Sequence, residues 1–184
     1  MKLLLENWKN FLNESVLGDY EGDLEFADDG DLILYHLSTS EDLTSLDPKV
    51  ARERAKGYTQ REYNSWERPR VFFFTQRGQE DTGVGRIAGK PYVAKVDPDL
   101  VYPVFRDPNG YNKPENRERY KKIRQERTGM APYYPVNAYE FMATMAEEDG
   151  FHGFIYPQKG GGLIVSMWNP IEVEPLESDF YKEN

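Results

Sequence analysis

The chain has 184 residues and carries 32 acidic against 23 basic side chains, which gives a formal net charge of −9. This acidic balance disfavours sequence-independent binding of DNA or RNA, because phosphate groups repel the protein. The absence of cysteine excludes a disulfide framework and a thiolate zinc site. Aromatic residues make up 14% of the chain, and no apolar run approaches the ~20 residues that span a bilayer. The sequence therefore predicts one packed domain with terminal extensions and no membrane segment.

The N-terminal segment, residues 1–14, predicts an amphipathic helix. Four apolar residues follow the spacing of one helical face: Leu4, Trp8, Phe11 and Leu12. The segment also resembles the capsid-targeting peptides of internal head proteins from T-even-like phages, which end at Leu-x-Glu or Ile-x-Glu. Leu12-Asn13-Glu14 stands at the matching distance from Met1, so the resemblance implies that a phage prohead protease cuts after Glu14. A terminal helix that packs on the domain is the alternative.

The remaining chain divides by composition. Residues 15–30 are rich in acidic residues and predict a solvated linker, with a loose edge strand as the alternative. Residues 31–177 hold the apolar runs and form the predicted domain, and residues 178–184 form a loose tail.

The apolar run at residues 32–35 predicts a buried strand, because it is short and is bounded by polar turn residues. His36 follows at its carboxyl end, where binding groups are often presented to a loop. A hydrogen-bonded histidine in the core is the alternative for this residue. Ser40 follows as the predicted N-cap of a short helix, with Glu41 or Asp42 in the first turn.

The rest of the domain predicts a mixed α+β fold. Further strands are expected at 70–75, 91–96, 100–105, 151–157, 163–168 and, as an edge strand, 171–175. Helices are expected at 50–63, at 111–128 and at 136–149, the last with Asn137 as cap, Glu140 in a capping box and Gly150 as its end. The strands cluster rather than alternate with helices, which favours α+β over a doubly wound sheet. The polar segment 106–131 predicts a solvated excursion, with a lid or partner surface as the alternative.

Two common chemistries find little support in the sequence. The only histidines, His36 and His152, are far apart and lack HxxxH or HExxH spacing, so no metal site is predicted. No GxSxG motif is present for a serine hydrolase.

Four segments, taken in order, resemble the ADP-ribosyltransferase family. Residues 34–38 (LYHLS) resemble the strand that carries the family's YHGT-type motif, and residues 71–75 (VFFFT) resemble its aromatic strand that ends in Ser or Thr. Residues 92–97 (YVAKVD) resemble the strand that follows, and residues 150–155 with 164–170 resemble the closing pair of phage-encoded members. The resemblance implies two small, bent, mostly antiparallel sheets around a cleft that binds NAD, with peripheral helices.

The resemblance also implies roles for individual residues. His36 would contact the nicotinamide ribose, and Thr75 would contact the carboxamide, so these two are the catalytic candidates. Strand-end capping is the alternative for Thr75. The residues expected to line the NAD site are Tyr35, His36, Leu37, Ser38, Phe74 and Tyr63. Tyr63, like Tyr58, would stack on nicotinamide from a lid, or else pack in the core or on the surface.

The chain departs from the family at the catalytic glutamate. That residue usually lies at or just before the last strand, but residues 162–168 (GLIVSMW) contain no carboxylate. Gln158 and Glu172 are displaced candidates for its place. Three outcomes stay open: a divergent enzyme, a protein that binds without catalysis, and a resemblance that does not hold.

Together the two resemblances imply a phage internal head protein that resides in the capsid and then enters the host cytoplasm. There it would transfer ADP-ribose from NAD to a host protein or nucleic acid, without a metal. The first rival is a catalytically inactive virion or host-factor-binding protein on the same fold. A second rival, an acidic inhibitor of a host nucleic-acid-binding protein, depends on the net charge alone.

Overall fold

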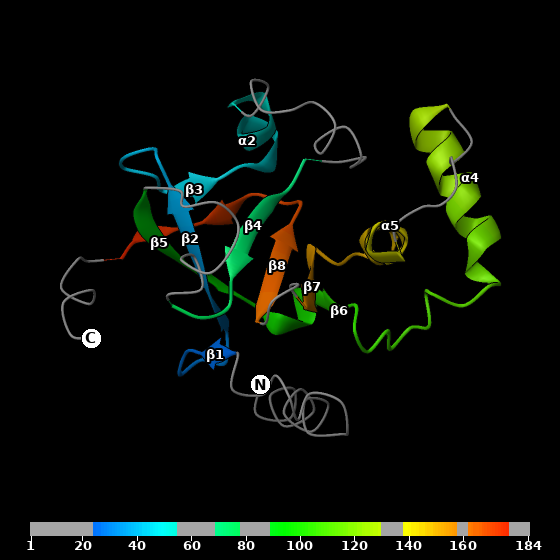
Figure 1. Cartoon of the computed structure of the whole chain (residues 1–184), viewed down its shortest axis with the longest axis horizontal. Coiled ribbons are helices and arrows are strands. Elements are labelled where there is room, and N and C mark those ends of the chain that lie inside the picture. Colours follow the sequence, from blue (N-terminus) through cyan, green and yellow to red (C-terminus); the bar gives the residue numbers. More distant parts are fainter. Residues whose placement is uncertain (1–23, 55–68, 78–88, 130–137, 158–161, 177–184) are drawn as a thin grey trace.

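The computed structural model describes residues 24–54, 69–77, 89–129, 138–157 and 162–176 (Figure 1). Several predictions therefore lie outside the described residues: those for 1–14, Tyr58, Tyr63, Asn137, Gln158 and 178–184.

The described chain is mixed α+β, as predicted (Figure 1). Its strands are β1 (Glu25–Phe26), β2 (Leu32–Ser38), β3 (Ser45–Leu46), β4 (Val71–Phe74), β5 (Lys90–Val96), β6 (Val101–Pro103), β7 (Gly153–Pro157), β8 (Leu163–Met167), β9 (Ile171–Glu172) and β10 (Glu174–Pro175). Its helices are α2 (Pro48–Arg54), α4 (Asn116–Thr128), α5 (Ala138–Glu148) and the short 3₁₀ helix η5 (Pro98–Leu100). The predicted strand segments are confirmed, with boundaries that differ by a few residues, except that the strand predicted at 171–175 is divided into β9 and β10, which belong to different sheets.

Most strands belong to one sheet, ordered β10-β5-β2-β4-β8-β7-β6, with β1 added beside β2. Its pairs are antiparallel except for β6 with β7. A second sheet holds only β3 and β9. The sheets are thus mostly antiparallel, as predicted, but very unequal in size.

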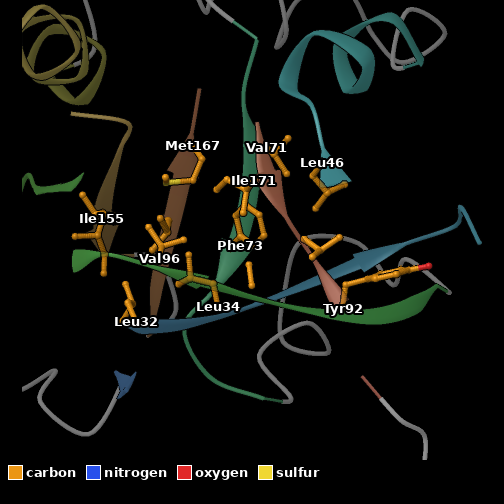
Figure 2. Close-up of a cluster of buried hydrophobic side chains, with 14 of the residues drawn as sticks. Leu32, Leu34, Leu46, Val71, Phe73, Tyr92, Val96, Ile155, Met167 and Ile171 are labelled. Atoms are coloured by element: carbon orange, nitrogen blue, oxygen red, sulfur yellow. The ribbon is translucent and has the colours of Figure 1, made fainter. Parts of the chain in front are cut away.

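The two faces of the large sheet bury separate apolar clusters. On one face, Leu34 of β2, Phe73 of β4 and Val165 of β8 are fully buried. Leu46 of β3 and Ile171 of β9 pack against the same cluster (Figure 2). Alternation along each strand places these side chains on a common side, so the small sheet covers this face.

At the β7 end of the sheet, the other face is covered by α5, and α4 lies against α5 on the side away from the sheet (Figure 1). Phe141 and Met145 of α5 are buried four residues apart, on the helix face that meets the sheet. Tyr120 of α4 is fully buried and packs edge-on against Phe141, with ring centroids 4.9 Å apart. Helix α4 therefore joins the domain through α5.

A buried ion pair links α5 to β4. Arg70 Nη2 donates to Glu140 Oε1 at 2.7 Å, and the two side chains are only 6% and 7% exposed. The guanidinium also lies 5.1 Å from the ring centre of Phe154. The predicted capping box involves Asn137, which lies outside the described residues, so it stays a prediction. Gly150, at φ +94°, follows the end of α5 as predicted.

The helix predicted to begin at Ser40 is wrong. Residues 39–44 form bends, β3 follows, and α2 begins only at Pro48. Asp42 has a φ of +55°, which no helix accommodates. The carboxylate of Asp47 accepts a hydrogen bond from the Lys49 amide at 2.8 Å, so Asp47 caps α2, and Pro48 fits its first turn.

The acidic segment before residue 31 is not wholly a linker. β1 pairs with β2, with Glu25 opposite Ile33 and Phe26 opposite Leu32. Leu24 belongs to the apolar cluster beneath the small sheet. The folded domain therefore extends at least to residue 24.

The described part of 106–131 contains the predicted helix as α4, and most of its side chains are exposed, but it is anchored to the domain rather than a free excursion. Tyr111 and Tyr120 are 2% and 0% exposed. Asp107 Oδ1 accepts hydrogen bonds from the Tyr102 hydroxyl at 2.5 Å and from the Tyr111 amide at 2.7 Å. The Tyr111 hydroxyl in turn donates to Asp149 at 2.5 Å, just beyond α5. Buried tyrosines with polar partners thus fix this segment to the domain.

Candidate functional site

The four segments that suggested the ADP-ribosyltransferase family form neighbouring strands. They correspond to β2, β4, β5, and the β7–β8 pair, and the sheet order places them as β5-β2-β4-β8-β7. Segments that are far apart in the sequence therefore make one continuous block of the sheet. His36 lies in β2, at the middle of this block.

His36 lies where the buried face of the sheet approaches the surface. Leu34, two residues earlier on the same face, is fully buried, whereas His36 is only partly buried. The His36 ring packs against Phe73 with ring centroids 5.5 Å apart. Tyr92 of β5 stands directly opposite His36 in the ladder. The imidazole is thus neither in the centre of the core nor fully in solvent.

One ring nitrogen of His36 is held by the main chain. Its Nδ1 lies 2.8 Å from the carbonyl oxygen of Phe72, which can only accept a hydrogen bond, so we assign the proton to Nδ1. Burial lowers the pKa of His36 below its ordinary value of 6.5, and the Phe72 carbonyl opposes this shift. The neutral ring then presents Nε2 as an acceptor. A ligand hydroxyl is the group that such a nitrogen would bind.

Ser38 lies two residues after His36, at the end of β2. Its Oγ accepts a hydrogen bond from the Ser40 amide at 3.1 Å, so it closes the turn that follows the strand. A Cβ placed on Gly89 would lie 2.7 Å from the Ser38 carbonyl oxygen. Glycine is therefore needed at position 89 for the two backbones to approach this closely.

Tyr35, Leu37 and Phe74 lie on the opposite face from His36. Tyr35 pairs with Phe74 across β2 and β4, and side chains alternate along each strand. Hence the structure divides the predicted NAD-lining residues between two faces of one sheet: His36 and Ser38 share one, whereas Tyr35, Leu37 and Phe74 share the other. These five side chains do not converge on a single point.

Tyr35 has polar partners of its own. Its hydroxyl donates to the Glu25 carboxylate, and the Arg77 guanidinium lies 5.6 Å from the ring centre. Burial, followed by the hydrogen bond to Glu25, raises the pKa of Tyr35 to about 12. This group fastens β1 to β2 and is separate from His36.

Thr75 is fully buried, and its Oγ1 donates to the Leu163 carbonyl oxygen at 3.3 Å. The hydrogen bond links the end of β4 to the start of β8. The structure therefore gives Thr75 a structural partner, in line with the alternative of strand-end capping, and leaves its hydroxyl closed to solvent.

The structure gives no carboxylate partner for His36 within the described residues. The influences on its pKa are burial and the Phe72 carbonyl, and neither is an acidic group. Glu172, one of the two displaced candidates, is exposed in β9 opposite Ser45. In chain order the next carboxylate after His36 is Glu41, whose Oε1 lies 3.2 Å from Lys90 Nζ in an exposed ion pair.

Sequence reasoning missed Tyr92 as a member of this site. The alternation of residues 91–96 predicted a strand, but no local signal indicates where the Tyr92 hydroxyl bonds. The structure shows that hydroxyl bonded to the loop that follows His36.

Among the described residues, no group of three or more histidine and acidic side chains is arranged to hold a metal ion. No helix in the described ranges is both long and apolar enough to cross a membrane.

Comparison with known proteins finds no relative of this chain. No protein-family model matches the chain, and no curated protein or solved structure matches it either.

Proposed function

We propose that the chain is an ADP-ribosyltransferase-like protein that binds NAD at the end of β2. The observation that carries the proposal is the convergence of its four motif segments into adjacent strands, with His36 at the centre. The neutral imidazole with an accepting Nε2 suits the hydroxyls of a ribose. NAD is the substrate, and no metal takes part.

In the proposed reaction the bond between nicotinamide and ribose breaks, and nicotinamide leaves with the bonding electrons. The anomeric carbon then forms a bond to a nucleophile of a host protein or nucleic acid, which loses its proton. Positive charge develops on the ribose, and nearby negative charge would stabilise this transition state. His36 would orient the ribose through Nε2.

A second candidate function is binding without catalysis. It is favoured by the position of Thr75 in the core and by the surroundings of His36, where no acidic group among the described residues shifts its pKa. In this form the protein would serve as a virion component or bind a host factor on the same fold.

We test the proposal by titrating NAD into the full chain in a calorimeter and by measuring nicotinamide release and transfer of labelled ADP-ribose in host lysate. The test variant is His36→Ala. The matched control is His152→Ala, because His152 precedes β7 and its amide bonds to Leu100 of η5, away from the end of β2. Binding with transfer, both lost only in His36→Ala, supports the enzyme. Binding without nicotinamide release, or no binding of NAD at all, rejects the enzyme and supports the second candidate.

The predicted targeting peptide places the protein in the phage capsid before delivery to the host. N-terminal sequencing of the protein from virions tests this part separately. A chain that begins at Ser15 supports cleavage by the prohead protease, and a chain that begins at Met1 contradicts it.

A further inference from the structure

The loop after β2, residues 39–43, is held by a hydroxyl from the neighbouring strand. The Tyr92 hydroxyl donates to the Ser40 carbonyl oxygen at 3.0 Å and accepts from the Leu43 amide at 3.4 Å. Tyr92 is only 1% exposed, so water competes little for these bonds. Figure 2 shows its hydroxyl pointing away from the apolar side chains around it.

Tyr92 also stands directly opposite His36 in the β2–β5 ladder. Tyr92 therefore lies next to His36 in the sheet and also bonds to the loop that follows β2. The loop needs such support, because Asp42 has a φ of +55°, a conformation that costs free energy in a residue other than glycine.

Among the described residues, this loop has further ties. The ion pair between Glu41 and Lys90 is exposed, with side chains 72% and 53% accessible, and surface pairs of this kind contribute little. Leu43 packs against the apolar cluster under the small sheet. The two hydrogen bonds of the Tyr92 hydroxyl add a buried polar anchor to this packing.

We infer that Tyr92 is the positioning residue of the His36 site: its hydroxyl fixes loop 39–43 beside the imidazole, so that a bound dinucleotide meets both in one preset geometry. This inference depends on the proposed function. Tyr92 acts through the loop and does not itself touch the ligand.

The test compares Tyr92→Phe with wild type, using NAD as the probe. The phenyl ring keeps the core packing and removes only the hydroxyl, so the variant is expected to fold. We expect a five- to thirtyfold loss of NAD affinity and faster hydrogen exchange at the Leu43 amide. The NMR titration of the His36 ring should stay unchanged.

The matched control is Tyr102→Phe. Tyr102 is also fully buried and bonded through its hydroxyl, but to Asp107 near α4. This control should lose thermal stability and keep the affinity of wild type, which separates positioning from a general loss of packing.

Three results would overturn the inference. Unchanged affinity in Tyr92→Phe, or an equal loss in both variants, rejects the role of Tyr92 while the NAD site stands. Wild-type protein that binds no NAD rejects the proposed function and the inference with it.

Discussion

His36 and Thr75 were predicted as one pair of site residues, yet their surroundings differ. Thr75 bonds to a main-chain carbonyl inside the core, whereas His36 bonds through one nitrogen and keeps the other as an acceptor. Sequence alone could not separate them, because each follows a similar apolar strand. The difference arises from β8, which covers Thr75 and comes from almost ninety residues later in the chain.

The environment of His36 predicts a pH dependence of stability. Its pKa is lowered in the folded state, so below pH 6.5 the unfolded chain binds a proton that the folded chain does not. This contribution is fully present above 6.5 and is lost as pH falls through the folded pKa. We expect the free energy of unfolding, measured with urea from about pH 5 to 7.5, to fall less steeply on acidification in His36→Asn. Parallel curves for the two proteins would contradict it.

Thr75 predicts a stability effect without a binding effect. Thr75→Val removes the donor to Leu163 and leaves a buried carbonyl unpaired, which should cost about 1–2 kcal/mol of unfolding free energy. Thr75→Ser, which retains the hydroxyl, is the control and should lose less. Urea unfolding measures both variants, and NAD affinity should stay at the wild-type value. A selective loss of affinity in Thr75→Val would return Thr75 to the site.

At the scale of elements, the sequence predicted the helices and strands that have a local apolar pattern. It failed to predict burial where that burial depends on contacts with residues far along the chain. The run at 32–35 and the periodicity of α5 were sufficient to place β2 and α5. The segment 106–131 looks solvated because its apolar residues are sparse. Its burial depends on Tyr111 reaching Asp149, a contact across 38 positions that no local pattern reports.

A further prediction concerns Gly153, where β7 approaches β8 closely. The sequence around Gly153 does not reveal this close packing. A Cβ on Gly153 would lie 2.1 Å from Met167 Sδ and 2.7 Å from the Ser166 carbonyl oxygen. Gly153→Ala should therefore lower the unfolding free energy by about 1–3 kcal/mol. A second change, Met167→Ala, should not restore it, since the Ser166 oxygen belongs to the main chain. Thermal or urea unfolding decides, and full rescue by the second change would contradict this account.

At the scale of the molecule, one sheet separates two apolar clusters and shares its strands between them. Because both clusters pack on the same strands, loss of one cluster also removes the sheet that supports the other. We therefore expect the domain to unfold in one cooperative transition. The α+β class could be predicted because a fold class follows from composition and from the local pattern of apolar residues. It could not predict which residues share a face, since this follows from the pairing of distant strands.

Two core variants test this cooperativity. Val165→Ala truncates the cluster under the small sheet, and Met145→Ala truncates the cluster under α5; both side chains are fully buried. Each should cost about 2–4 kcal/mol and move the whole transition. Far-UV circular dichroism and Trp168 fluorescence, read in a chain with Trp8 and Trp66 replaced by Phe, should give coincident curves. Separate midpoints for the two probes would show independent halves.

The buried contact between Arg70 and Glu140 has a consequence for how the sequence can diverge. Removing either charge alone takes a close partner from the other buried charge, at a cost of about 3–5 kcal/mol. Replacing both with apolar residues of similar size carries a much smaller penalty. Descendants of a common ancestor should therefore keep both charges or lose both, and a lineage with only one should be rare.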